Sequence, residues 1–460
     1  MRVLFATAEL APVVKVGGLG DASSGLVKAL RGLGVEVDVV IPDYWAGRHR
    51  GGEVIGLDTP EWTGRAEAHL ATISGLDPVY LLSAPSLARP DPYNDEAGRG
   101  WPDNDRRFFS FSAAVASFVE RTEPDVVHLN DWHTGAVPAL MEQSPPTVFT
   151  MHNPAYQGMT DGSWLDVLVR RQDAYEWQGG MNPLAGAIAL ADTVTTVSPG
   201  FVAELKSEAT SFGLSGPLRA RGDRFVGILN GIDTEVWDPG SDPHLPVRYG
   251  AESATRKRTN AAALRRELGL VDSAGPIVGM VTRLTDQKGV DLALEAITAV
   301  ADLDVQFVLL GSGDRDLANS VRTMAERRKG RFAFVDAFDE GLAHRIFAGC
   351  DLILVPSRFE PCGLTQMQAM RYGAMPVVTP VGGLNDTVVD DDRAGGGGTG
   401  FVAEDVSADS ISDALARAIR AWRSTRRRGQ IRNRVMSREW SWRGPAADYL
   451  TLYQTISRSR

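Results

Sequence analysis

The sequence predicts an α/β protein with two doubly wound, Rossmann-like domains, because strand and helix patterns alternate in two separate series. The first series opens with an apolar strand at residues 3–8, a helix at about 22–33 and a strand at 35–41. A strand–helix–strand unit of this kind implies a parallel sheet. A second series begins with the strand at 276–281. The 460 residues also exceed what one core accommodates and suit two domains of roughly 200 residues each.

Composition limits the class of function. A hydrophobic content of 43% and a charged content of 23% are ordinary for a globular protein, and the net charge of −10 argues against a nucleic-acid partner. No apolar run approaches the ~18 residues of a membrane span, and the chain enters its first strand without a signal peptide. We therefore expect a cytoplasmic protein with no membrane partner.

The cysteine and histidine content predicts neither a disulfide framework nor a metal site. Cys350 and Cys362 are the two cysteines, and the histidines are scattered. The segment 128–133 holds two histidines and an aspartate, but their spacing alone does not define a set of ligands. We expect no metal and no cofactor.

A stretch rich in Pro, Gly and Asp at 237–246 has no apolar period, which predicts a mobile linker between the domains. We accordingly expect a first domain at 1–240, a second at 241–442 and a terminal helix at 443–460. The tetraglycine run at 395–398 is expected to form a flexible, exposed loop.

The stretch 355–370 predicts a ligand site. It follows an apolar strand at 351–355 and leads into a helical pattern. Pro361 biases Glu360 away from helical dihedral angles, so the Glu360 carboxylate should lie in the loop that opens the helix. Unpaired N–H groups at a helix start suit a phosphate or a sugar hydroxyl, and open α/β sheets bind ligands at this edge. A surface acid beside a buried Cys362 is the alternative.

A glycine-rich loop at 15–21 joins the first strand to the first helix. Its glycines let the backbone approach a ligand closely, with a helix N-terminus facing it. Gly18 and Gly20 form part of a dinucleotide-binding fingerprint, but Ser23 stands where the third glycine belongs. Lys15 adds a cation that such a fingerprint does not need.

Polar residues also follow other predicted strands. Asp131 ends the strand segment 125–131, and His152 ends the next strand, where a buried structural histidine is the alternative. Arg283 and Lys288 bracket the loop after the strand 276–281. Two cations at a strand's carboxyl end suit a diphosphate, whose charge they would neutralise.

These segments closely resemble the bacterial glycogen synthases and plant starch synthases, which are retaining glycosyltransferases of the GT-B type with two Rossmann-like domains facing a central cleft. The matching motifs are Lys-x-Gly-Gly-Leu-Gly-Asp at 15–21, His-x-x-Asp-Trp-His at 128–133, His-Asn and Ala-Tyr-Gln-Gly at 152–158, Asn-Gly-Ile-Asp at 230–233, Arg-Leu-x-x-Gln-Lys-Gly at 283–289 and Glu-Pro-Cys-Gly-Leu-Thr-Gln at 360–366. The sequence departs from the family at Val16, Pro154 and Ala337, where Thr or Ser, Leu or Ile, and Gly are usual.

The resemblance implies transfer of glucose from ADP-glucose to the non-reducing end of an α-1,4-glucan, with UDP-glucose as the alternative donor. It implies catalytic roles for Lys15, Asp131, His152, Arg283, Lys288 and Glu360. Further substrate contacts are implied for Gly18, Asp21, Asn153, Asn230, Phe338, Cys362, Gly363, Leu364 and Thr365, with Phe338 stacking on the base. It also implies that the terminal helix packs back onto the first domain.

Other functions remain alternatives. A sugar-nucleotide epimerase uses the same double-domain scaffold, and an NAD-dependent oxidoreductase would need a complete G-x-G-x-x-G. A degenerate glucan-binding protein is opposed by the presence of Lys15, Arg283, Lys288 and Glu360. The sequence leaves the oligomeric state open, as well as the choice between a covalent and a front-face mechanism.

Overall fold

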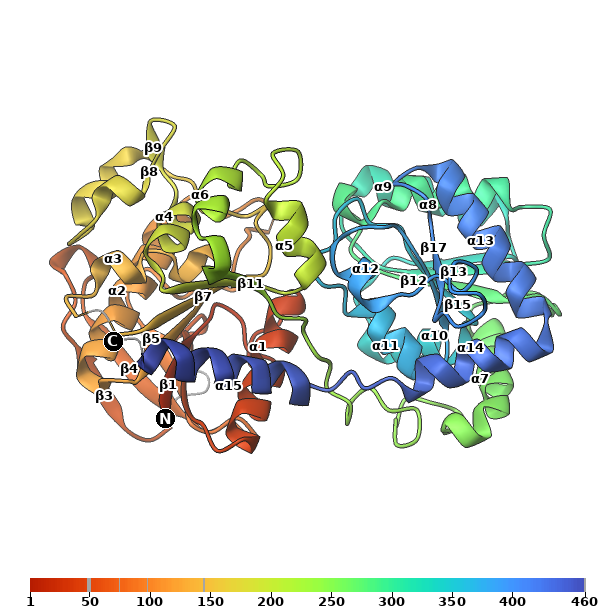
Figure 1. Ribbon diagram of the computed structural model, residues 1–460, viewed down its shortest axis with the longest axis horizontal. Helices are drawn as coiled ribbons and strands as arrows, with labels where there is room; N and C mark the ends of the chain where they lie inside the picture. Colours follow the sequence, from red (N-terminus) through yellow and green to blue (C-terminus); the bar gives the residue numbers. More distant parts are fainter. Residues whose placement is uncertain (48–50, 74, 97, 144, 459–460) are drawn as a thin grey trace. The chain divides into compact units, whose positions relative to one another are not determined.

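The computed structural model describes residues 1–47, 51–73, 75–96, 98–143 and 145–458 (Figure 1). The chain divides into two compact α/β units: unit 1 is Met1–Gly231 with Trp442–Arg460, and unit 2 is Ile232–Ser441. The boundary that we expected at residue 240 therefore lies between Gly231 and Ile232. Among the described residues, no helix is long and apolar enough to cross a membrane.

Unit 1 contains a nine-stranded sheet in the order β11-β10-β7-β6-β1-β2-β5-β4-β3. Its strands are β1 (Arg2–Ala6), β2 (Glu36–Pro42), β3 (Val54–Leu57), β4 (Ala66–Ala71), β5 (Val79–Ser83), β6 (Val126–Asn130), β7 (Thr147–Met151), β10 (Thr193–Thr196) and β11 (Phe225–Gly227). Only the β3–β4 and β4–β5 pairs in this sheet are antiparallel. A separate hairpin joins β8 (Glu176–Trp177) to β9 (Gly180–Met181).

The helices of unit 1 cover both faces of its sheet. They are α1 (Gly18–Gly32), α2 (Asn104–Thr122), α3 (Val137–Leu140), α4 (Pro183–Leu190), α5 (Pro199–Leu205), α6 (Ser215–Ala220) and α15 (Arg443–Arg458). Side chains alternate along β1, so that Leu4 joins one apolar cluster and Phe5 joins the other. The sheet is thus buried on both sides, as parallel sheets are.

The terminal helix α15 packs against unit 1 and is tied to its core. The Trp442 ring lies over Gly25 of α1, where a Cβ atom would come within 2.0 Å of Trp442 Nε1. In the interior, Tyr453 Oη lies 2.6 Å from His128 Nδ1. The expected return of the last helix to the first domain is therefore what the structure has.

Unit 2 contains a six-stranded, all-parallel sheet in the order β14-β13-β12-β15-β16-β17. Its strands are β12 (Ile277–Val281), β13 (Gln306–Leu310), β14 (Phe332–Val335), β15 (Leu352–Val355), β16 (Met375–Val378) and β17 (Phe401–Val402). Its helices are α7 (Lys257–Glu267), α8 (Val290–Ala299), α9 (Arg315–Arg327), α10 (Glu340–Gly349), α11 (Thr365–Arg371), α12 (Gly382–Thr387), α13 (Ala408–Arg423) and α14 (Thr425–Ser437).

The stretch 237–246 lies within unit 2 rather than between the two units, so its predicted position as the linker is wrong. Trp237 is buried and stacks on His344 of α10, with ring centroids 4.0 Å apart and an interplanar angle of 10°. Asp242 is buried as well, with Oδ2 2.7 Å from His344 Nδ1 and 2.6 Å from Tyr372 Oη. A composition rich in Pro, Gly and Asp argues against helix and strand. It does not show whether the side chains of Trp237 and Asp242 pack against the rest of a domain.

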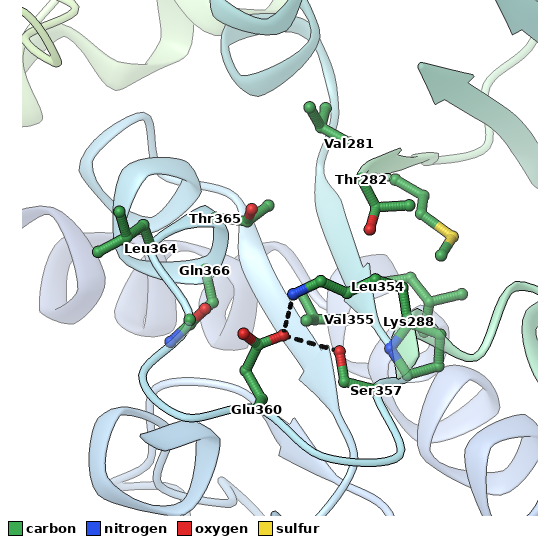
Figure 2. Close-up of a pocket in the computed structure, with 13 residues that line it drawn as sticks. Val281, Thr282, Lys288, Leu354, Val355, Ser357, Glu360, Leu364, Thr365 and Gln366 are labelled. Carbon is green, nitrogen blue, oxygen red and sulfur yellow. Dashed lines mark hydrogen bonds and ion pairs between the residues drawn. The ribbon is translucent and has the colours of Figure 1, made fainter. Parts of the chain in front are cut away.

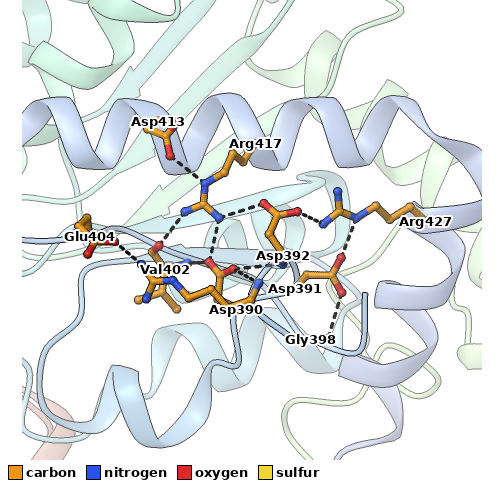
Figure 3. Close-up of polar contacts among 10 residues, drawn as sticks. Asp390, Asp391, Asp392, Gly398, Val402, Glu404, Asp413, Arg417 and Arg427 are labelled. Carbon is orange, nitrogen blue, oxygen red and sulfur yellow. Dashed lines mark hydrogen bonds and ion pairs between the residues drawn. The ribbon is translucent and has the colours of Figure 1, made fainter. Parts of the chain in front are cut away.

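The tetraglycine run at 395–398 adjoins a cluster of acids and arginines in unit 2 (Figure 3). The cluster includes Asp390, Asp391, Asp392, Arg417, Arg427 and Arg434. The fully buried Asp391 carboxylate accepts hydrogen bonds from Arg427 at 2.6 Å, from Arg434 at 2.8 Å and from the Gly398 backbone N–H at 3.0 Å. The first three glycines are exposed as expected, whereas Gly398 is buried.

Candidate active site

The glycine-rich loop of unit 1 holds Lys15 beside the start of α1. Lys15 Nζ forms an ion pair with Asp21 Oδ1 at 3.0 Å. The helix begins at the exposed Gly18, four residues earlier than expected, so Gly20 lies in its first turn. Within this turn Gly20 packs closely on the preceding loop, where Ala11 N donates to Gly20 O at 3.1 Å and an added Cβ would meet Val14 O. Helix propensity alone, which disfavours glycine, does not reveal this packing.

A buried carboxylate that our sequence reasoning missed supports this loop. Glu9 Oε2 accepts hydrogen bonds from the backbone N–H groups of Val16 and Gly17, at 2.8 and 2.9 Å. Glu9 Oε1 accepts a hydrogen bond from Tyr93 Oη at 2.9 Å. A lone acid after a buried strand, in an otherwise apolar run, was the available signal.

Asp131, His152 and Asn153 come together at the carboxyl ends of β6 and β7. The buried Asp131 has φ = +54°, and its Oδ1 accepts hydrogen bonds from His152 N at 2.7 Å and Asn153 N at 3.4 Å. Burial raises the pKa of Asp131 to about 7, against the lowering effect of these two bonds. A strained dihedral angle and a perturbed carboxyl at one edge of the sheet are typical of a functional site.

His152 is held as a neutral imidazole. Its Nε2 lies 2.9 Å from Asn130 Oδ1, and burial lowers the pKa of His152 to about 3. Its side chain can therefore exchange hydrogen bonds with a ligand but carries no charge near neutral pH. Asn230, another expected contact, is buried in the loop after β11.

The two histidines of 128–133 do not converge on a ligand position. His128 lies between Tyr453 and the Thr150 hydroxyl, with Nε2 2.6 Å from Thr150 Oγ1. His133 stacks on Tyr93, with ring centroids 5.1 Å apart. Within the described ranges, no group of three His, Cys, Asp or Glu residues is arranged to hold a metal ion.

In unit 2, Lys288 and Glu360 form an ion pair in which the carboxylate is buried and the ammonium group is partly buried. Lys288 Nζ donates to Glu360 Oε2 at 2.6 Å, and the Ser357 hydroxyl donates to the same oxygen at 2.8 Å (Figure 2). The pair lines a cavity of about 30 Å³, enough for a water molecule. The cavity is also lined by Ser357, Gly363, Leu364, Thr365 and Gln366. Expected donor-binding residues from two loops thus border one cavity.

The Glu360 loop is closed on one side by α12. Gly383 N donates to Glu360 O at 3.0 Å, and a Cβ atom on Gly383 would lie 2.2 Å from Cys362 O. Cys362 is itself buried, with 5% exposed. The substrate contact implied for Cys362 suggests an accessible thiol, and this expectation is wrong because tertiary packing, which sequence spacing does not show, buries the residue. Gly363 turns the chain with φ = +76°.

Arg283 and Phe338 lie outside that cavity. Arg283 follows β12 and is exposed, and its guanidinium has no ion-pair partner among the residues that the structure describes. Phe338 follows β14 and is 77% exposed. Both come from carboxyl ends of strands in the unit 2 sheet, but the structure does not bring either one to the Lys288–Glu360 pair.

The chain matches known proteins over its whole length. Residues 2–220 match the starch synthase catalytic domain, and residues 265–434 match glycosyl transferases group 1. Glycogen synthase 2 of Bradyrhizobium diazoefficiens is 40% identical, with 100% of this chain and 99% of that protein covered. Glycogen synthase of Halorhodospira halophila is 39% identical, with 100% of each covered.

Solved structures agree with these matches. The catalytic domain of starch synthase IV from Arabidopsis thaliana, bound to ADP and acarbose, has a TM-score of 0.89 and 34% identity, covering 100% of this chain and 99% of that one. Sucrose-phosphate synthase from Thermosynechococcus elongatus shares the fold, with a TM-score of 0.65 at 18% identity, covering 100% of each chain. The chain is thus a glycosyltransferase. More specifically, the chain belongs to the glycogen synthase and starch synthase family, which confirms the resemblance seen in the sequence.

Proposed function

We propose that this protein transfers glucose from ADP-glucose to the non-reducing end of an α-1,4-glucan with retention of the anomeric configuration. The observation that carries the proposal is the Lys288–Glu360 pair, which borders a cavity at the carboxyl ends of β12 and β15 in a chain of this family. The solved relative that binds ADP supports the choice of an adenine nucleotide. UDP-glucose is the alternative donor.

Unit 2 would bind the donor. Lys288 and the exposed Arg283 would neutralise the diphosphate, which becomes the leaving group and gains charge as the glycosidic bond breaks. Glu360 would accept hydrogen bonds from sugar hydroxyls through Oε1, since Oε2 already receives Lys288 and Ser357. The exposed Phe338 ring is free to stack on the base.

Unit 1 would contact the glucose and its phosphate. Lys15 would approach the phosphate, and Asp131 with the neutral His152 would border the sugar. Further contacts are proposed for Gly18, Asp21, Asn153 and Asn230 in unit 1, and for Gly363, Leu364 and Thr365 at the unit 2 cavity. The buried Cys362 would support this loop through its backbone rather than present its thiol.

Three further points stay predictions from the sequence: no cofactor takes part, Arg283 and Lys288 do the work of a metal ion, and the enzyme is cytoplasmic. A chelator should accordingly leave activity unchanged. An epimerase, the other function considered, would convert a nucleotide sugar without an acceptor.

The proposal is tested by incubating the protein with glucose-labelled ADP-glucose and glycogen. Label should enter the polymer and be released by an exo-acting α-1,4-glucanase. Release of a changed nucleotide sugar without incorporation would instead favour the epimerase. Incorporation that requires an added divalent ion would contradict the metal-free mechanism.

A further inference from the structure

Glu9 is a buried acid in a position that the proposed chemistry does not use directly. Its side chain lies beyond the end of β1 and is 4% exposed. Both carboxylate oxygens are engaged, Oε2 by the N–H groups of Val16 and Gly17 and Oε1 by the Tyr93 hydroxyl. An acid accepting three hydrogen bonds at such a place fixes the groups that donate to it.

The groups that Glu9 holds are two backbone N–H groups directly before the start of α1. Val16 directly follows Lys15, and Gly17 is the N-cap of α1, with no side-chain cap of its own. Glu9 therefore does not cap the first turn itself, but anchors the two backbone N–H groups that lead into it. Any shift of these two N–H groups would move the Lys15 Cα atom with them.

Tyr93 holds Glu9 from the other side and is itself fixed. Its ring stacks on His133, and the loop before it is held by Arg107, whose Nη1 donates to Pro92 O at 2.9 Å. The buried Arg107 guanidinium also donates to Leu87 O at 3.1 Å. A rigid series of contacts therefore runs from α2 through Tyr93 and Glu9 to the Lys15 loop.

We propose that Glu9 is a positioning residue that holds the Lys15 loop in the geometry needed for glucose transfer, with Tyr93 fixing its carboxylate. The proposal rests on the proposed function for its kinetic consequence. Both carboxylate oxygens of Glu9 are engaged by unit 1 itself, so in this proposal its effect on the rate passes through Lys15. Its structural consequence, protection of the Val16 and Gly17 amides, does not depend on the substrate.

A double-mutant cycle between Glu9 and Lys15 tests the kinetic part. Glu9→Ala and Lys15→Ala should each lower kcat at saturating ADP-glucose by at least about tenfold. If Glu9 acts through Lys15, the double variant should be within about twofold of Lys15→Ala alone. Glu9→Gln, which keeps an oxygen to accept the two N–H groups, should lose less than Glu9→Ala. Multiplied effects in the double variant, or an unchanged kcat for Glu9→Ala, would overturn the proposal.

Amide hydrogen exchange gives a readout that is independent of activity. In Glu9→Ala, which removes the acceptor, the Val16 and Gly17 amides should exchange at least about tenfold faster than in the wild type, while β1 stays protected, and Glu9→Gln should lie between the two. Equal exchange would overturn the proposal even for an active enzyme. If the wild type transfers no glucose while these amides respond, the proposed function fails and the positioning role of Glu9 stands as structure alone.

Asp192 provides a matched control in the same unit. Its carboxylate also accepts a backbone hydrogen bond, from Thr147 N at 2.8 Å, but at the amino end of β10. Asp192→Asn should keep kcat within about twofold of the wild type. If Glu9→Ala does not fold, the same cycle with Glu9→Gln decides the question. A comparable loss of kcat in Asp192→Asn would show that other carboxylates that accept backbone hydrogen bonds in unit 1 affect the rate equally, which contradicts a specific role for Glu9.

Discussion

Lys288 Nζ and Glu360 Oε2 lie 2.6 Å apart although 72 positions separate the two residues in the sequence. Each follows one of two adjacent parallel strands, β12 and β15, whose pairing places both loops at the same edge of the sheet. Both side chains are largely buried, with 18% and 8% exposed. Removing one partner of such a pair leaves the charge of the other partner uncompensated in a largely buried position, which is unfavourable.

We predict that substitutions of Lys288 and Glu360 affect different quantities, ADP affinity for Lys288 and kcat for Glu360. Lys288→Ala should weaken ADP binding by at least about tenfold, because it removes a charge-assisted contact to the diphosphate. Glu360→Gln should lower kcat by at least about tenfold, with a smaller effect on ADP affinity. Calorimetric titration with ADP and steady-state kinetics separate the two effects.

An exposed ion pair in the same unit serves as the control. Arg331 and Asp304 are about half exposed, with Arg331 Nη1 2.5 Å from Asp304 Oδ1. Arg331→Ala should change neither ADP affinity nor kcat, because exposed pairs contribute little. Wild-type turnover in Glu360→Gln would remove Glu360 from the catalytic site.

Phe338 should affect donor binding without affecting stability. Its ring is 77% exposed, so Phe338→Ala should change the free energy of unfolding by less than about 0.5 kcal/mol. Stacking of a base on an aromatic ring contributes roughly 1–3 kcal/mol, which predicts that KM for ADP-glucose rises by about tenfold. Val406→Ala, at another exposed apolar side chain of unit 2, should change neither quantity. An unchanged KM for Phe338→Ala would place the base elsewhere.

The cysteines should be unreactive in the folded protein. Cys350 and Cys362 are both buried, and burial raises the pKa of Cys350 to about 12. A bulky thiol reagent should therefore modify neither thiol before unfolding, and Cys362→Ser should retain most activity. Thiol counts before and after denaturation measure this. Rapid inactivation of the native enzyme with one equivalent incorporated would show that one of the two thiols is accessible in solution.

Acid should destabilise unit 1 through its buried histidines. Burial lowers the pKa of His128, His133 and His152 to about 3. An unfolded histidine has a pKa of about 6.5, so between these values the unfolded chain binds protons that the folded one does not, and stability falls as pH drops. Asp131 acts in the opposite direction, because its raised pKa of about 7 lets the folded protein keep a proton that the unfolded chain releases.

Replacing one of these histidines should flatten the pH dependence. His128→Gln should reduce the slope of unfolding free energy against pH, between about pH 4 and about pH 6, by about 1.4 kcal/mol per pH unit. Denaturant titrations across this range give the slope. His244→Gln, at an exposed histidine, should leave the slope unchanged. An unaltered slope in His128→Gln would mean that His128 is protonated in the folded protein.

The sequence allowed prediction of features that depend on local pattern. Strand β1 was expected because apolar residues run without a break, and Lys288 and Glu360 were expected at strand ends because parallel sheets bind ligands there. The direct bond between them could not be predicted, since it depends on which strands are neighbours. The burial of Cys362, and the close approach of Gly383 to its backbone, depend on tertiary packing in the same way.

Residues that position other residues could not be predicted from the sequence. Glu9 belongs to no motif, and its role is visible only once its carboxylate is placed against the Val16 and Gly17 amides. The linker prediction at 237–246 failed for a related reason. The residues around Trp237 have the composition of a linker, but the Trp237 ring stacks on His344. The contact between Glu9 and the Val16 and Gly17 amides, and the contact between Trp237 and His344, both depend on tertiary structure that no sequence motif describes.

The central claim is most directly tested by comparing kcat/KM for ADP-glucose and UDP-glucose, with glycogen as acceptor and no added metal ion. We expect glucan elongation in which both kcat/KM and the final amount of glucose incorporated are far higher with ADP-glucose than with UDP-glucose. Comparable values for the two donors would contradict the assignment of ADP-glucose, and a clear preference for UDP-glucose would reverse it.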